Sequence, residues 1–146
     1  MKLFYKKILI ILFTNLLFAN VVYSATFNWT KVAKAEDGSF EIFYDKKSVL
    51  RNGENIYYWQ MMNNLKDIED DIYSSISHNM ANCDSYEMRS LTLVSFKSPM
   101  GRGPTDMEII IPKDAPDYFK WVYFDKKETI QGLLLNQVCN QPGLQN

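Results

Sequence analysis

The sequence predicts an α+β fold: a mostly antiparallel sheet of about six strands, with a C-terminal helix packed on one face and one disulfide. Three observations support this class. Segments of alternating apolar and polar residues, typical of half-buried strands, recur between turn residues. One segment near the C-terminus has helical spacing of its apolar residues. The chain also contains only two cysteines, Cys83 and Cys139.

The first two strands are expected within residues 27–35 and 39–45. FNWTKVAKA alternates weakly, and the turn sequence EDG follows it. In SFEIFYD, alternate apolar residues share one face of a strand, and only Phe43 breaks the pattern. The two segments therefore predict a hairpin, and Asp45 is expected to cap a short helical turn in the following KKSVL.

The next hairpin is expected to turn at Asn52-Gly53, because both residues tolerate the positive φ of the favoured two-residue turn. The aromatic-rich segment from Ile56 to Met62 then predicts a strand. Residues 63–75, NNLKDIEDDIYSS, are polar and acidic without a clear period. They predict a surface loop.

Two further strands are expected in SHNMANCD and YEMRSLTLVSFK, joined near Asp84-Ser85. The apolar residues of the second segment change parity near Val94, which indicates a bulge or a strand covered on both faces. Residues 107–111 and 121–124 predict two short strands after it.

Between these strands, SPMGRG contains two glycines, Gly101 and Gly103, of the kind that can cradle a phosphate. A phosphate-binding loop has to open a helix, but Pro104 follows at once and the next regular residues predict a strand. We therefore interpret the segment as a connection between strands. Arg102 is expected to project into solvent as a candidate contact residue.

The last element is a helix expected from Lys126 to Val138, with Asp125 as its N-cap and Glu128 three residues later. One face of this helix must be buried, and the sheet is the large apolar surface available for it. The residues expected on that face are Ile130, Leu133, Leu134, Gln137 and Val138.

The N-terminus has the three parts of a secretory signal, so we expect a signal peptide over residues 1–24 and a single α+β domain over 25–146. The apolar run, residues 8–19, is short for a membrane span, which needs about 20 apolar residues. An uncleaved N-terminal anchor is the alternative. No cysteine lies near the expected cut before Ala25 to accept a lipid. The protein is therefore expected to be exported, periplasmic or secreted, with no stable membrane anchor.

The charge of the exported part argues against nucleic acid as a partner. Three of the 16 Lys and Arg and none of the 17 Asp and Glu lie in the signal, which leaves 13 positive and 17 negative charges, a net charge of −4. Nucleic-acid binding depends on phosphate neutralisation by a basic surface. No cofactor is expected either.

Cys83 and Cys139 both fall in the exported part, and an even count in an oxidising compartment indicates one disulfide. Such a bridge would fasten the end of the helix to a central strand. The bridge would close a loop of 56 residues. Closing a loop of that length stabilises a fold by roughly 4 kcal/mol. A reactive or metal-binding pair is the alternative, but Cys-x-x-Cys spacing is missing.

Several segments form an ordered set along the chain: NWTKV, DGSFEIFYD, SVLRNGENIYYWQMMN, a cysteine, RSLTLVSFKSPMGRG, WVYF and LLLNQVC. Their distinctive parts are Tyr44-Asp45 with Ser48, Arg51-Asn52-Gly53 leading to Trp59, Cys83, and the loop from Met100 to Gly103 after Phe96. In this order they resemble the bacterial surface-adhesin protein E family, from about Trp29 to Cys139.

The resemblance implies a small antiparallel sheet with a helix and a disulfide between Cys83 and Cys139. It also implies a non-catalytic protein similar to lipid-anchored surface proteins that bind host laminin, vitronectin and plasminogen. This chain departs from them because it lacks the lipid-accepting cysteine after its signal.

Few residues suggest chemistry. His78 is the only histidine, with Ser75 and Ser77 nearby, and a partly exposed strand residue is its simpler interpretation. The acidic residues that could attract calcium are Asp67, Glu69, Asp70 and Asp71, but they lack the EF-hand order and are interpreted as a solvated loop. The aromatic residues that could form a binding face are Tyr44, Tyr57, Tyr58, Trp59, Trp121, Tyr123 and Phe124, although core packing explains most of them.

The predicted function is an exported, non-catalytic binding module that recognises a protein or a cell-envelope component. The first alternative is a small exported hydrolase that uses carboxylates or His78. The second is a structural envelope protein that oligomerises along an exposed sheet edge, with a homodimer among the expected assemblies.

Overall fold

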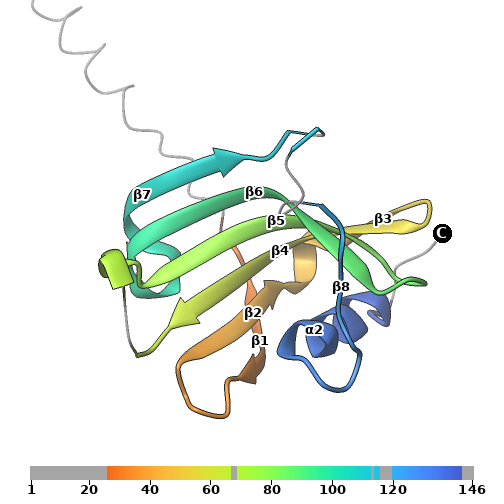
Figure 1. Ribbon diagram of the computed structural model, residues 1–146, viewed down its shortest axis with the longest axis horizontal. Coiled ribbons are helices and arrows are strands. Elements are labelled where there is room, and N and C mark those ends of the chain that lie inside the picture. Colours follow the sequence, from red (N-terminus) through yellow and green to blue (C-terminus); the bar gives the residue numbers. More distant parts are fainter. Residues whose placement is uncertain (1–25, 67–68, 113, 116–119, 143–146) are drawn as a thin grey trace, which may run out of the picture.

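The computed structural model describes residues 26–66, 69–112, 114–115 and 120–142. One antiparallel sheet has the strand order β1-β2-β4-β5-β6-β7, and the short strands β3 and β8 pair with β4 and β6. In the described chain one α-helix, α2, lies against one face of this sheet (Figure 1). The predicted fold class is therefore confirmed. The expected signal peptide and its cleavage site lie outside the described residues.

The elements follow the chain in a simple order. Their bounds are β1 Trp29–Lys34, β2 Phe40–Asp45, the 3₁₀ turn η1 Lys46–Ser48, β3 Leu50–Asn52, β4 Asn55–Asn64, η2 Glu69–Asp71, β5 Ser74–Asn82, β6 Glu87–Ser98, η3 Pro99–Gly101, β7 Arg102–Ile110, β8 Val122–Tyr123 and α2 Ile130–Cys139. Within the described residues, no helix has the length and apolarity needed to cross a membrane.

The first hairpins agree with the sequence pattern except at one turn. β1 pairs with β2, and the Asp45 carboxylate caps η1 by accepting a hydrogen bond from Lys47 N at 3.0 Å. Between β3 and β4, Asn52 pairs with Asn55, so the two loop residues begin at Gly53 and not at Asn52. Gly53 has the positive φ, 61°, that this turn requires.

The central strands are longer than expected. β4 continues to Asn64 and β5 begins at Ser74, so the predicted loop over residues 63–75 is shortened at both ends. A bulge, one of the two alternatives indicated for this strand, is present in β6, but it lies at Leu91 and not near Val94, because His78 pairs with Thr92 whereas Asn79 pairs with Ser90. The glycine segment connects β6 to β7, as predicted, and β7 already begins at Arg102.

The helix begins later than expected, at Ile130. Its N-cap is Thr129, whose hydroxyl accepts a hydrogen bond from Gly132 N at 2.9 Å. Asp125 caps the preceding turn instead, accepting from Lys127 N at 2.8 Å and from Glu128 N at 3.1 Å. The predicted start at Lys126 was wrong because two good capping residues lie four positions apart and the first of them caps only a turn.

The buried face of α2 also differs in part from the prediction. Leu134 and Val138 are fully buried, as expected, but Leu135 is buried with them. Leu133 is 42% exposed, and Gln137 is exposed. Leu133, Leu134 and Leu135 are consecutive, so their side chains point to different sides of the helix. Helical spacing alone therefore could not identify which side is buried.

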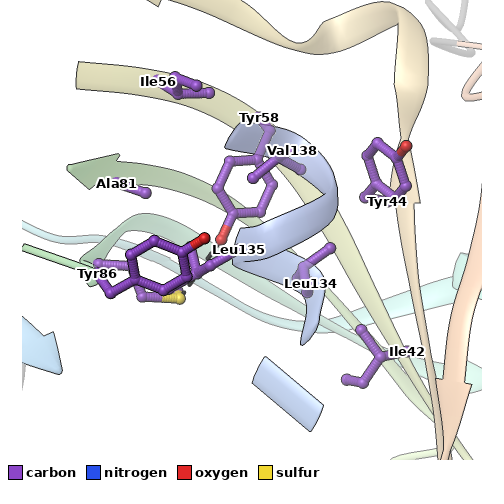
Figure 2. Close-up of a cluster of buried hydrophobic side chains, with 10 residues drawn as sticks. Ile42, Tyr44, Ile56, Tyr58, Ala81, Tyr86, Leu134, Leu135 and Val138 are labelled. Carbon is purple, nitrogen blue, oxygen red and sulfur yellow. Dashed lines mark hydrogen bonds between the residues drawn. The ribbon is translucent and has the colours of Figure 1, made fainter. Parts of the chain in front are cut away.

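The main core lies between α2 and the sheet (Figure 2). Tyr58 and Ile56 from β4 are completely buried against the helix leucines. The Tyr58 hydroxyl donates to the Met88 sulfur at 3.4 Å, and burial raises the pKa of this phenol far above its usual range. A buried tyrosine with its polar tip satisfied contributes a large apolar surface without leaving an unpaired donor.

The predicted disulfide is present. Cys83, just after β5, is bonded to Cys139, the last residue of α2, with their Cα atoms 5.7 Å apart. The bridge fastens the C-terminal end of the helix to the sheet.

The other end of α2 depends on a close approach at Gly132. A Cβ atom on this residue would lie 1.7 Å from the backbone carbonyl oxygen of Asp125. The turn that precedes the helix therefore packs directly on the helix backbone, and only glycine leaves room for it.

We predict that Gly132→Ala lowers the free energy of unfolding by at least about 2 kcal/mol, because the turn at Asp125 must move away from the helix. Helix propensity alone would give the opposite sign, since alanine is favoured over glycine by about 1 kcal/mol inside a helix. Urea unfolding measures the change. Leu133→Ala, at the adjacent exposed position, is the matched control and should change stability much less. A Gly132→Ala variant as stable as the wild type would contradict the close packing.

Candidate functional site

The face of the sheet opposite α2, here called the open face, has its own apolar cluster. Side chains alternate along β4, so Tyr58 and Gln60 face the helix while Trp59 and Met61 face the other way. Three buried residues form the centre of this cluster: Phe43, Met61 and Ile76. The α-helix does not cover it, and only the short η3 turn packs against part of it, through Met100 and Gly101. The residues packed around the cluster are only partly buried: Phe27, Trp29, Trp59, Phe96 and Met100.

Five rings of the open face make consecutive contacts and are here called the aromatic strip: Phe27, Trp29, Trp59, His78 and Tyr57. Phe27 stacks on Trp29 with ring centroids 4.7 Å apart, and it contacts Trp59 at 5.6 Å. His78 stacks on Trp59 at 4.7 Å and lies 6.2 Å from Tyr57. These distances are typical of favourable aromatic pairs.

Trp59 is positioned by a hydrogen-bonded connection to the end of β2. Its backbone N donates to the Ser48 hydroxyl at 3.0 Å, and that hydroxyl donates to the Asp45 carbonyl oxygen at 2.8 Å. The buried Asp45 carboxylate also accepts from Asn28 N at 3.4 Å, next to the first rings of the strip. Asp45 therefore anchors the backbone between Phe27 and Trp29, and Ser48 connects Asp45 to the backbone of Trp59.

The loop between β6 and β7 supports the same face. Met100 N donates to the buried Asn63 side chain at 2.8 Å, and Gly101 N donates to the buried Ser74 hydroxyl at 2.9 Å. These loop amides already bind side-chain oxygens, which agrees with a structural role and not with phosphate binding. Arg102 is exposed at the start of β7 and is not among the rings of the strip.

His78 lacks the surroundings of a catalytic base. Ser77 lies on the opposite face, where its hydroxyl accepts from Asn79 Nδ2 at 2.9 Å. Burial against Trp59 lowers the pKa of the imidazole, which disfavours its charged form. In the part of the chain that is described, no three His, Cys, Asp or Glu side chains gather as a metal site would require.

The other sequence candidates fall into different environments. Asp70 and Asp71 are exposed in η2, and Asp67 lies outside the described residues. Tyr44 and Tyr58 belong to the main core, with Phe124 packed against it. Trp121 and Tyr123 are 37% and 61% exposed at the β8 edge of the sheet, away from the strip.

Sequence reasoning selected Tyr57 and Trp59 but missed Phe27, Trp29 and His78 as their neighbours. The alternation of Phe27 and Trp29 was a usable signal that both rings share one face. The contact between Trp59 and His78 follows from their direct pairing across β4 and β5. That register is a property of the assembled sheet, and one segment alone does not reveal it.

Comparisons with known proteins agree with this architecture. The sequence model of the family described as surface-adhesin protein E matches residues 29–140. The chain is similar to crystal form II of Haemophilus influenzae protein E, with a TM-score of 0.51 and 11% identity over 75% of this chain and 86% of that one. The selenomethionine form of the same protein gives 0.52 and 11% over 76% and 86%. At this identity the structures show a shared fold. No curated protein sequence matches the chain.

We predict a pH dependence of stability that comes from His78. Its pKa is lowered from 6.5 in the folded state, so the unfolded state binds a proton more readily. The group should have no effect well above pH 6.5 and should reduce the free energy of unfolding as the pH falls below this value.

Two measurements check this prediction. An NMR titration of the imidazole should give a midpoint below 6.5. Urea unfolding at about pH 7.5 and about pH 5 should show a smaller pH-dependent loss of stability in His78→Phe, which keeps a ring against Trp59 but cannot titrate. An imidazole titration midpoint at or above 6.5 would contradict the burial of His78. Equal pH-dependent losses of stability in the wild type and in His78→Phe would contradict it as well.

Proposed function

The chain belongs to the surface-adhesin protein E family, and on that premise we propose that it is an exported, non-catalytic binding module that recognises a protein or cell-envelope component through the aromatic strip. The observation that carries the proposal is the run of stacked rings on the open face. Large aromatic side chains supply much of the binding energy in protein interfaces, especially in the centre of the contact.

The arrangement of the rings favours binding for a second reason. Phe27 and His78 lean on the two tryptophans, and the Asp45 and Ser48 hydrogen bonds fix the strands that carry them. A partner therefore meets rings that are already ordered, and little side-chain entropy is lost on binding. Partly buried rings also keep an exposed edge that a partner can cover.

A binding role fits the environment of the titratable groups better than hydrolysis does. His78 stacks on Trp59 and makes a tilted contact with Tyr57, and its neighbour Ser77 points to the opposite face. Export to an oxidising compartment is supported by the disulfide and by the family. Periplasmic and extracellular locations are both compatible with this function.

We predict that Trp59→Ala weakens partner binding by about 30-fold or more, because truncation of a central aromatic residue typically costs 2 kcal/mol or more. The exported protein would be immobilised and incubated with cell-envelope extract and with purified laminin, vitronectin and plasminogen, and affinity for any captured protein would be measured by biolayer interferometry. His78→Ala removes the ring that stacks on Trp59 and should also weaken binding.

Tyr123→Ala is the matched control, because it removes an exposed ring at the β8 edge without touching the strip. Its affinity should equal that of the wild type. Thermal melting of each variant separates lost binding from lost folding. Full binding by a folded Trp59→Ala variant, or loss of binding only in Tyr123→Ala, would exclude the strip as the recognition surface.

A further inference from the structure

A groove of about 340 Å³ lies on the helix face of the sheet, beside the first turn of α2. Its lining residues are Phe40, Ile42, Gln60, Met62, Phe124, Thr129, Ile130 and Gln131. β2 and β4 form the floor, where Ile42 pairs with Met62. The groove exists because the helix has only ten residues and is shorter than the strands it covers (Figure 1).

The lining of the groove is apolar and carries no charge. Five of its side chains are apolar, and the other three, Gln60, Thr129 and Gln131, are neutral. The nearby Asp125 carboxylate is occupied by the backbone N–H groups of Lys127 and Glu128. An ionised ligand would therefore lose water on entering without gaining a counter-charge, whereas a neutral apolar ligand would not pay this cost.

A pair of amides supplies the polar end of the groove. Gln131 Nε2 donates to Gln60 Oε1 at 2.6 Å, and Gln60 Nε2 donates to Gln131 Oε1 at 3.2 Å. Gln60 Oε1 also accepts from Asn79 Nδ2 at 3.4 Å. Among the described residues, these bonds use one of the two Gln60 N–H groups and one of the two lone pairs on Gln131 Oε1. One donor and one acceptor are left for a ligand.

We propose that this groove binds a small uncharged molecule with an alkyl chain or similar apolar body and one neutral head group, such as a hydroxyl or a primary amide. The body lies against Phe40, Met62 and Ile130, and the head hydrogen-bonds to the Gln60 and Gln131 amides. Ligand sites of this size, about 300 Å³ or more, are typically apolar with a few placed polar groups. The groove and the aromatic strip lie on opposite faces of the sheet, so this proposal is independent of the proposed function.

The test uses the exported protein and the uncharged fluorophore N-phenyl-1-naphthylamine as the probe. Saturable fluorescence enhancement is expected, together with displacement by 1-decanol. Decanoate and decyltrimethylammonium have the same chain length but a charged head, and each should displace the probe at least about tenfold less effectively. No saturable binding, or equal displacement by all three compounds, would overturn the proposal.

The site is located with the wild-type protein, so the result does not depend on a variant that folds. Addition of 1-decanol should shift the NMR signals of the Gln60 and Gln131 side-chain amides and of the Met62 methyl group. Shifts confined to Trp59 and the open face would show that the probe binds elsewhere and would overturn the assignment.

A pair of variants then tests the shape of the groove. Ile130→Trp fills it and should weaken probe binding by at least about tenfold, while Leu133→Trp introduces the same ring at an exposed position of the same helix and should have no effect. Unchanged probe binding by a folded Ile130→Trp variant would overturn the proposal. A second result would also overturn it: the wild type binds no small molecule, and Ile130→Trp loses the binding of a protein partner. The groove would then hold a side chain of that partner.

Discussion

The contact between α2 and one face of the sheet forms the main core and makes the two faces of the sheet different. Its buried area comes from Leu134, Leu135 and Val138 packed on Tyr58 and Ile56. A ten-residue helix is too short to be stable by itself, so it depends on this packing. It is held at both ends, by the bond between its last residue and Cys83 and by the backbone contact at Gly132.

Because the helix occupies one face, the two faces of the sheet have different uses. On the covered face, the short helix buries a core at one end and leaves a neutral groove beside its first turn. On the open face, Phe43, Met61 and Ile76 form a small buried cluster, and the contacting rings of the aromatic strip lie on the same face. The residues around Asp45 and Ser48 are important here, since their hydrogen bonds fix Trp59. Their place in the segments that resemble the family therefore has a structural explanation.

The fold was largely predictable because its determinants are local. Alternating residues identified β1 and β2, and an even count of cysteines identified the disulfide. The start of α2 was not predictable in the same way: Asp125 and Thr129 are both good caps, and the turn at Asp125 folds back onto the helix backbone at Gly132, a contact that the capping pattern does not reveal. The turn at Gly53 was displaced by one residue because asparagine and glycine both tolerate positive φ.

The candidate site was less predictable, because it depends on strand register. Trp59 was an obvious aromatic candidate, whereas His78 was interpreted as a partly exposed strand residue, with catalysis as the alternative, and the structure places it in β5 with intermediate burial. They contact each other because β4 and β5 pair these two positions directly, and a one-residue shift would place them on opposite faces. The groove depends on where the helix ends and on how far it covers the sheet, which no single segment of the sequence specifies.

The disulfide fastens the end of α2 to one face of the sheet, and thermal unfolding measures how much this bond contributes. The oxidised protein would be compared with the reduced protein and with the Cys83→Ser/Cys139→Ser variant. A structural bridge that contributes roughly 4 kcal/mol should lower the unfolding midpoint by more than about 10 °C in both. An unchanged midpoint in the reduced protein and in the variant would show that the helix is held without the bridge and would contradict this account.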